Sequence, residues 1–224
     1  MAYRNIVILG NGAHSKVLVS EILKLKNFKI IGFVNYNKKF KKIITYNKKN
    51  YKNYKNIKDI KNIYNKKIYG IIGIGTNFIR KKVHDQISRS KIKLIWQTIV
   101  SRHAIIDKNV KIGEGSFVAT GVVINTGTVI GRHCIINTLS SIDHDNHFDD
   151  FSSTGPRITT GGNVTVGKLS FIGIASVIKH KINIKENTII GGYSFVNKNC
   201  KKNSIYLGIP IKRISHRKSN QKYL

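Results

Sequence analysis

Large apolar residues recur at every sixth position from Val100 to Val196. Only Thr154 and Thr160 break this series of 17 positions. A helix repeats its faces every 3.6 residues and a strand every 2, so neither keeps a six-residue register over this length. These positions form the interior series: Val100, Ile106, Ile112, Val118, Ile124, Ile130, Ile136, Ile142, Phe148, Thr154, Thr160, Val166, Ile172, Ile178, Ile184, Ile190 and Val196.

The six-residue register predicts a parallel β-solenoid with three short faces per coil. Each hexapeptide would supply one face and point its large residue inward, so three hexapeptides make an 18-residue coil and the series makes between five and six coils. Glycine often follows the large residue, as at Gly113 and Gly131, and small or β-branched residues such as Ser116, Thr128 and Cys134 stand four places after it. We expect these small residues to allow the corners between faces.

The first 97 residues alternate between buried strands and amphipathic helices. The expected strands are 5–9, 30–34 and 69–74, with a possible short strand at 94–96, and the expected helices are 16–25 and 80–88. This alternation predicts a small α/β domain with a parallel sheet. The chain would therefore consist of two domains, residues 1–97 and residues 98–224.

Basic residues dominate the composition, with a formal net charge of +30. Lysine outnumbers arginine 32 to 8 and accompanies Asn and Ile, whereas a dedicated nucleic-acid reader favours Arg. We therefore expect no nucleic-acid partner, although the charge favours anionic small molecules. Residues 38–67 hold 12 Lys and one acid, Asp59, which predicts a solvated and loosely ordered surface segment.

The remaining composition indicates an intracellular protein. Cys134 and Cys200 are too few for a disulfide scaffold, and both stand inside the six-residue repeat. The N-terminus leads into only four apolar residues, 6–9, which is too short for a signal peptide or a membrane span. We expect a cytoplasmic protein with no membrane span.

A glycine turn, Gly10-Asn11-Gly12-Ala13-His14-Ser15, follows the first expected strand and precedes a helix. Backbone N–H groups at such a helix start bind anions. The dinucleotide fingerprint requires a third glycine where this chain has Ser15, and an acid about 20 residues later, where it offers Asn35 and Asn37. A nucleotide-sugar, which needs only the turn and the helix dipole, fits better than NAD.

The solenoid carries one unusually polar segment around His144. Four of the ten acids of the chain fall within eight residues there, beside His144 and His147. His144 is the third residue of its hexapeptide and should project outward. A histidine flanked by carboxylates is kept basic and in one tautomer, which suits a general base. The four acids are Asp143, Asp145, Asp149 and Asp150.

The combined motifs resemble the bacterial sugar O-/N-acyltransferases of the sialic-acid and bacillosamine pathways. The resemblance covers nearly the whole chain and rests on segments 8–15, 72–77, 79–82, 137–145, 161–164, 171–174 and 207–214. It implies a Rossmann-like α/β domain that binds a nucleotide-sugar, followed by a left-handed parallel β-helix that binds acetyl-CoA. It also implies a homotrimer with active sites between subunits and no metal.

The same resemblance assigns roles to individual residues. His144 would be the general base assisted by Asp145, and the backbone of Gly162 and Ile174 would contact acetyl-CoA. Where the family has a second active-site histidine, nine residues after the first, this chain has Ser153. The sugar substrate would be bound by Gly10, Asn11, Gly12, His14, Asn35 and Gly75.

The sequence therefore predicts acetyl-CoA-dependent N-acetylation of a nucleotide-linked 4-amino sugar for surface glycan synthesis. O-acetylation of sialic acid or a related sugar is the alternative reaction, and a non-enzymatic nucleotide-sugar-binding scaffold is the alternative class. A zinc enzyme of the carbonic anhydrase type is disfavoured. His144 and His180 would stand two coils apart, roughly 9–10 Å, which is too far for one ion.

Overall fold

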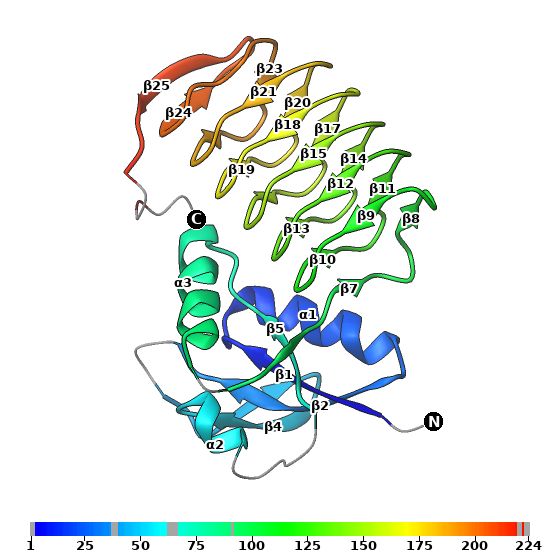
Figure 1. Ribbon diagram of the computed structural model, residues 1–224, viewed down its shortest axis with the longest axis vertical. Coiled ribbons are helices and arrows are strands. Elements are labelled where there is room, and N and C mark those ends of the chain that lie inside the picture. The colour runs from blue at the N-terminus through cyan, green and yellow to red at the C-terminus, as the bar shows by residue number, and fades with distance from the viewer. Residues whose placement is uncertain (1–2, 37–39, 62–66, 91, 219–220, 222–224) are drawn as a thin grey trace. The chain divides into compact units, whose positions relative to one another are not determined.

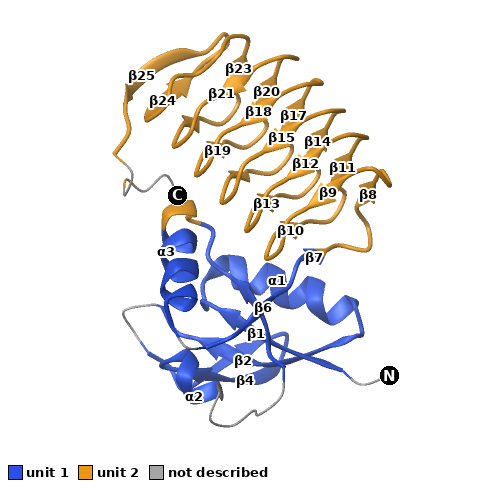
Figure 2. Ribbon diagram, viewed as in Figure 1, with its two compact units in different colours: residues 1–75, 79–99 blue, residues 76–78, 100–224 orange. Residues whose placement is uncertain are grey.

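A computed structural model describes residues 3–36, 40–61, 67–90, 92–218 and 221. The chain divides into two compact units, residues 1–75 with 79–99 and residues 76–78 with 100–224 (Figure 2). Within the described residues, no helix is long and apolar enough to cross a bilayer.

The first unit is a six-stranded sheet in the order β3-β4-β2-β1-β5-β6, joined by three helices (Figure 1). All neighbouring strands are parallel except β3 and β4. This arrangement confirms the predicted α/β region with a parallel sheet. The elements are β1 Arg4–Leu9, α1 Ala13–Lys24, β2 Phe28–Val34, β3 Ile43–Tyr46, β4 Lys49–Tyr54, α2 Ile57–Lys61, β5 Tyr69–Ile72, α3 Asn77–Ser88 and β6 Ile95–Trp96.

Two helices begin earlier than their apolar pattern predicts. α1 starts at Ala13 rather than at residue 16, and α3 starts at Asn77 rather than at residue 80. The first turn of a helix has few packing contacts of its own, so its side chains give little periodic signal. The strands at 5–9, 30–34 and 69–74 are found with ends shifted by at most two residues.

The lysine-rich segment is more ordered than its composition predicts. β3, β4 and α2 all lie within residues 38–67, so the expectation of a loosely ordered surface is wrong for residues 43–61. Tyr46 and Tyr51 are buried and pack edge-on against Phe33, with ring centroids 5.3 and 5.7 Å apart. Aromatic residues spaced among the lysines bury enough apolar area to offset the ordering of the hairpin. Residues 38, 39 and 62–66 lie outside the described residues.

The second unit is a parallel β-solenoid whose coils stack as successive rungs (Figure 1). Residues 18 positions apart pair in every face, as in Phe117↔Ile135, Val123↔Ser141 and Val129↔His147. The three-faced, 18-residue coil is therefore confirmed. Its two-residue strands are β7 99–100, β8 105–106, β9 111–112, β10 117–118, β11 123–124, β12 129–130, β13 135–136, β14 141–142, β15 147–148, β16 153–154, β17 159–160, β18 165–166, β19 171–172, β20 177–178, β21 183–184, β22 189–190 and β23 195–196, followed by the antiparallel pair β24 Ser204–Leu207 and β25 Lys212–His216.

The interior series fills the inside of this solenoid. All its members from Val118 to Val196 are buried, including the two threonines. Val100, Ile106 and Ile112 are only half-buried, because the first coil has a neighbouring coil on one side alone. Each fully buried aliphatic side chain contributes about 1.5–3 kcal/mol, so the series is the main source of solenoid stability.

The corners of the coils do not depend on glycine alone. From Ile112 to Ile190, the residue three places after each interior position has left-handed backbone, and from His133 to Tyr193 this residue is never glycine. The glycines that directly follow interior positions lack a side chain where the next coil packs closely against them. A Cβ on Gly173, for example, would lie 2.4 Å from the backbone nitrogen of Gly192 in the next coil. Neighbouring coils can therefore approach closely at these points.

Candidate functional site

The carboxyl ends of three parallel strands meet at the glycine turn of the first unit. Gly10 follows β1 and donates its N–H to the Val34 carbonyl of β2 at 2.8 Å, while Gly73, after β5, donates to the Leu9 carbonyl at 2.8 Å. Gly10 has φ +110°, and a Cβ there would lie 2.7 Å from the Ile74 side chain. Open α/β sheets bind ligands at this edge, where helices leave in different directions.

Ser15, which replaces the third glycine of the dinucleotide fingerprint, has a structural task. Its buried hydroxyl lies 2.9 Å from both the Gly10 and the Gly73 carbonyl oxygens. Because a hydroxyl has one hydrogen to donate, the two carbonyls share it. Ser15 thus joins the loops that follow β1 and β5.

The start of α1 is open in the described structure. Gly12 is its N-cap residue with extended backbone, no side chain caps the helix, and a Cβ on Gly12 would meet nothing within 4 Å. The first N–H groups of a helix have no intrahelical acceptor. Within the first unit, the predicted anion site at the start of α1 is therefore open to a ligand.

Two side chains frame this turn. Asn11 donates its amide to the Asn35 side-chain oxygen at 3.0 Å, which brings together two residues predicted to bind substrate. Tyr46 of β3 donates its hydroxyl to the Asn11 carbonyl at 3.0 Å. Tyr46 was not predicted as a site residue, because it lies in the lysine-rich segment that was expected to be a loosely ordered surface. Asn37 lies outside the described residues.

His14 and Gly75 meet the side chain of Arg80. The buried Arg80 guanidinium donates to the Ile74 and Gly75 carbonyls at 3.0 and 2.8 Å. Burial, with a smaller effect of the Arg80 charge, lowers the pKa of His14 to about 3. His14 is therefore a neutral imidazole at physiological pH and offers hydrogen bonds without charge. Arg80 lies in segment 79–82, which contributes to the family resemblance, but no role was predicted for it.

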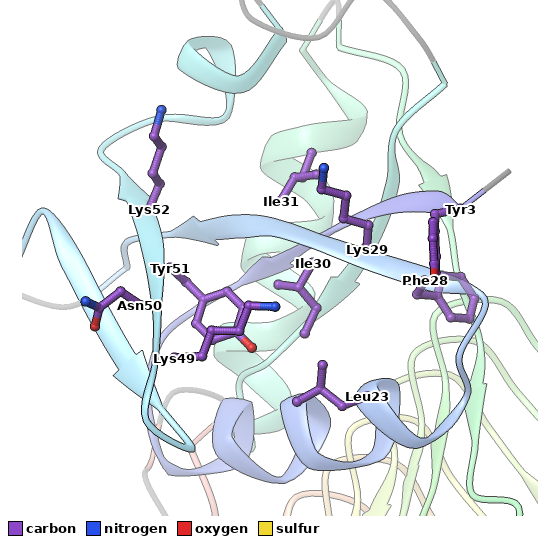
Figure 3. A pocket seen from close by; sticks show the side chains of 10 residues that line it. All are labelled: Tyr3, Leu23, Phe28, Lys29, Ile30, Ile31, Lys49, Asn50, Tyr51 and Lys52. Atoms are coloured by element: carbon purple, nitrogen blue, oxygen red, sulfur yellow. The ribbon is translucent and has the colours of Figure 1, made fainter.

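Two hollows open on the first unit. One of about 510 Å³ begins at the end of β2 and is lined by Asn35, Tyr36 and residues of α2 and α3. Burial raises the pKa of Tyr36 to about 12, so its phenol stays protonated. The other, of about 570 Å³, lies between the amino-terminal halves of β2 and β4 and is lined by Tyr3, Leu23, Phe28–Ile31 and Lys49–Lys52 (Figure 3). Of the predicted substrate residues, Asn35 lines the first hollow.

In the second unit, His144 and Asp145 form a hydrogen-bonded pair on one corner. The imidazole Nδ1 lies 2.8 Å from the Asp145 Oδ2, and both side chains are about half exposed, at 49% and 57%. Asp145 is the left-handed residue of the corner, with φ +55°, a conformation that Asp tolerates better than most residues. The hydrogen bond that the imidazole makes to Asp145, followed by the charges of Asp143 and Asp145, raises the pKa of His144.

Gly162 lies against the imidazole from the next coil. A Cβ on Gly162 would lie 2.5 Å from both Cε1 and Nε2 of His144. Its carbonyl accepts the Lys181 N–H at 2.9 Å, whereas none of the hydrogen bonds found in the described part of the chain uses its own N–H. The structure therefore brings together three of the predicted residues: His144, Asp145 and Gly162.

Ile174 occupies another corner of the same chain. It stands 12 residues after Gly162, which is two faces rather than a full coil of 18, and about half of its surface is exposed. Ser153 differs from the histidine that the family resemblance implies. It is buried and donates its hydroxyl to Asn77 Oδ1 at 2.6 Å, while Asn77 donates to the Leu169 and Ser170 carbonyls.

Metal-binding geometry is not found in the described ranges. No group of three or more His, Cys, Asp or Glu side chains there could hold an ion. His147, the other histidine of the acidic segment, places its Nε2 2.9 Å from Asp149 Oδ1.

Known proteins share both halves of this arrangement. Residues 5–87 match the family model described as the PglD N-terminal domain. Among solved structures, a histidine-to-asparagine mutant of perosamine N-acetyltransferase from Caulobacter crescentus, in complex with CoA and GDP-perosamine, matches with a TM-score of 0.86 and 22% identity. The match covers 96% of this chain and 98% of that one.

Two further solved structures agree. The acetyltransferase domain of PglB from Neisseria gonorrhoeae, in complex with acetyl coenzyme A, matches with a TM-score of 0.84 and 19% identity over 95% of this chain and 100% of that one. WeeI from Acinetobacter baumannii matches with a TM-score of 0.74 and 17% identity, at 94% and 100% coverage. These likenesses confirm the predicted fold, an α/β region followed by a left-handed parallel β-helix.

Proposed function

We propose that the protein transfers an acetyl group from acetyl-CoA to the amino group of a nucleotide-linked sugar. The observation that carries this proposal is the corner of the β-helix, where the His144–Asp145 pair meets Gly162. Acyl transfer needs a base for the incoming nucleophile and a donor for the oxyanion, and these residues supply both types of group. The likeness to an N-acetyltransferase seen with CoA, and to an acetyltransferase domain seen with acetyl-CoA, supports the same reaction.

In the proposed reaction, the acceptor amine attacks the thioester carbonyl while His144 takes its proton. The C–N bond forms, the C–S bond breaks, and the thiolate of CoA leaves as the tetrahedral intermediate collapses. Asp145 holds the imidazole and stabilises its charged form, as the raised pKa of His144 indicates. The Gly162 N–H is the proposed donor to the oxyanion, because it has no acceptor within the described chain.

The first unit would bind the nucleotide part of the acceptor. A diphosphate suits the open start of α1, where several N–H groups and the helix dipole favour negative charge. Asn35 rather than an acid follows β2, and its amide oxygen is already bound to Asn11. The hollow beside Asn35 and Tyr36 offers a place for the base or ribose. The substrate residues proposed are Gly10, Asn11, Gly12, His14, Asn35 and Gly75.

The separation of Gly162 and Ile174 favours a site shared between subunits. In a single chain these two proposed acetyl-CoA contacts stand on different corners of the β-helix. A homotrimer would bring one corner of each subunit against a different corner of its neighbour, so that one acetyl-CoA could reach both.

Release of CoA thiol identifies the reaction. Acetyl-CoA would be mixed with the protein and with GDP-perosamine, UDP-linked 4-amino sugars or free sialic acid, and the thiol followed spectroscopically. We expect turnover with a nucleotide-linked amino sugar and N-acetylation of the product by mass spectrometry. Turnover with sialic acid alone would assign the O-acetyltransferase reaction, and ligand binding without any turnover would assign the scaffold.

A further inference from the structure

Two buried polar side chains, Asn146 and Thr160, lie inside the β-helix next to the His144 corner. Thr160 breaks the apolar interior series, and Asn146 is the one residue with an amide among the positions four places after each interior residue. Both side chains are buried, with exposures of 3% and 1%. Burying polar groups costs free energy unless they are hydrogen-bonded, so their contacts explain their presence.

Asn146 connects the coil of His144 to the coil of Gly162. Its amide nitrogen lies 2.6 Å from the Asp143 carbonyl and 3.1 Å from the Gly161 carbonyl, and its oxygen accepts the Val164 N–H at 2.8 Å. Asp143 immediately precedes His144, and Gly161 immediately precedes Gly162. One buried side chain therefore holds the backbone on both sides of the contact between the imidazole and Gly162.

Two threonines complete the cluster. The Thr160 hydroxyl accepts the Asp143 N–H at 3.1 Å and lies 3.1 Å from the Asn146 amide nitrogen. Thr128 donates to the Asp143 carbonyl at 2.8 Å and accepts the Asn146 N–H at 3.2 Å. The peptide groups of Asp143 are thus bound from the inside of the helix, while its carboxylate accepts the His144 N–H at 2.8 Å on the outside.

We propose that Asn146, Thr160 and Thr128 are positioning residues that fix the orientation of the His144–Asp145 pair toward Gly162. The inference rests on the proposed function for its catalytic meaning. A displacement of about 1 Å in a reacting group can reduce turnover about 100-fold, so the spacing of the two coils at this corner matters for catalysis. All three side chains are buried, so they would act on the site through the backbone they bind.

Few charged side chains surround His144, so its pKa can be used to test whether its position has changed. Asp143 and Asp145 are the charged side chains next to it on its own coil. At the matching corner, the preceding coil carries Asn125, Thr126 and Gly127, and the following coil carries Gly162 and Asn163, all uncharged. His180 and Lys181 stand one coil further. A change in the pKa of His144 would therefore report the positions of Asp145 and Asp143 relative to the imidazole.

Thr160→Val is the test variant, and Thr154→Val is its matched control. Both replace a buried interior threonine by an isosteric apolar residue that the repeat favours. Thr154 accepts the Asn137 N–H at 2.9 Å, and no hydrogen bond found among the described residues joins it to Asp143 or Asn146. Thr160→Ser keeps the hydroxyl. Asn146→Ser, which introduces the residue most common at its repeat position, is the second test variant.

We expect Thr160→Val and Asn146→Ser to lower kcat about tenfold or more with little change in KM, and Thr154→Val and Thr160→Ser to stay within twofold. The pKa of His144, followed by NMR titration of ¹³C-labelled histidine, should fall in the two test variants alone. The NMR measurement does not require turnover, so it remains informative even if no acetyl acceptor is found. An unchanged His144 pKa in both test variants, or equal effects of Thr154→Val and Thr160→Val, would overturn the proposal.

Discussion

The imidazole of His144 and the Cα of Gly162 are in direct contact across neighbouring coils. A methyl group on Gly162 would lie 2.5 Å from two atoms of the His144 ring, closer than any real packing contact. Since His144 is about half exposed, its ring could turn away into solvent to relieve the clash. The glycine therefore sets the position of the histidine rather than the stability of the coil.

Gly162→Ala should accordingly leave the fold intact and lower turnover about 10- to 100-fold, because a small displacement of the proposed base, His144, strongly reduces the rate of the reaction. The measurement compares kcat and the melting temperature of the variant with wild type. Gly161→Ala is the contrasting control. Its Cβ would lie 2.8 Å from the backbone of His180, which cannot move aside, so that variant should lose stability. A Gly162→Ala enzyme with wild-type kcat would contradict the proposed geometry.

Gly12→Val tests the proposed nucleotide site. The position has extended backbone and open space around its Cβ, so the substitution should not affect folding. It would obstruct the approach of a diphosphate to the start of α1, and affinity for the nucleotide-sugar should fall at least tenfold while acetyl-CoA affinity stays near wild type. Isothermal titration with each ligand decides the matter. Equal loss of both affinities would show that the binding roles are not divided as proposed.

Gly10→Ala serves as the structural counterpart. Gly10 has φ +110°, and its Cβ would meet Ile74 at 2.7 Å, so we expect a lower melting temperature. If Gly12→Val proved as destabilising as Gly10→Ala, the open environment described for Gly12 would be wrong.

Ile136→Asp should unfold the β-helix, since an unpaired charge in a dry interior costs several kcal/mol. Ile136 is fully buried in the interior series. Ile106→Asp occupies the same repeat position in the half-buried first coil and should be much milder, because its carboxylate can reach water. Circular dichroism melts of the two variants measure the difference. A cooperative, wild-type melt for Ile136→Asp would refute the assigned register.

The sequence predicted the β-helix better than the lysine-rich segment for a physical reason. The interior series places an inward-facing residue at 17 regularly spaced positions, so the pattern remains clear although two of these residues are threonines. The β3–β4 hairpin depends on a few aromatic residues, such as Tyr46 and Tyr51, whose burial against Phe33 is decided by tertiary packing. The lysine-rich composition of this segment predicts exposure to solvent, and the packing of the two tyrosines against Phe33 is seen only in the folded structure.

The candidate site was predictable to a similar, partial extent. The acidic surroundings single out His144, and the resemblance to sugar acyltransferases implies Asp145 and Gly162. The 18-residue coil places Thr160 directly beside Ile142, next to His144. The exception at Thr160 was therefore a usable signal. The roles of Asn146 and Ser15 could not be predicted from the sequence, because these side chains bind backbone carbonyls whose directions depend on the exact path of the chain.

Asp145→Asn should separate the orienting role of the acid from its charge. Asn tolerates the left-handed backbone at this corner as well as Asp does, so the fold should persist. The carboxylate is the largest cause of the raised pKa of His144, and only the neutral imidazole can accept a proton. Without it the pKa falls, and the acid limb of the kcat–pH profile should move to lower pH. A limb that stays in place would mean that Asp145 does not tune the base.

His144→Ala should leave folding and both binding affinities nearly unchanged, because the side chain is about half exposed and its proposed role is proton transfer. Removal of a general base typically costs 10²–10⁴-fold in turnover. For an amine acceptor the deficit should shrink as pH rises toward the pKa of the amine, because the free amine then needs less help. His147 is a possible substitute base, although its Nε2 is bound to Asp149, so the double variant with His147→Ala tests residual activity. Turnover of His144→Ala within twofold of wild type at neutral pH, with chemistry shown to be rate-limiting, would remove this histidine from the mechanism.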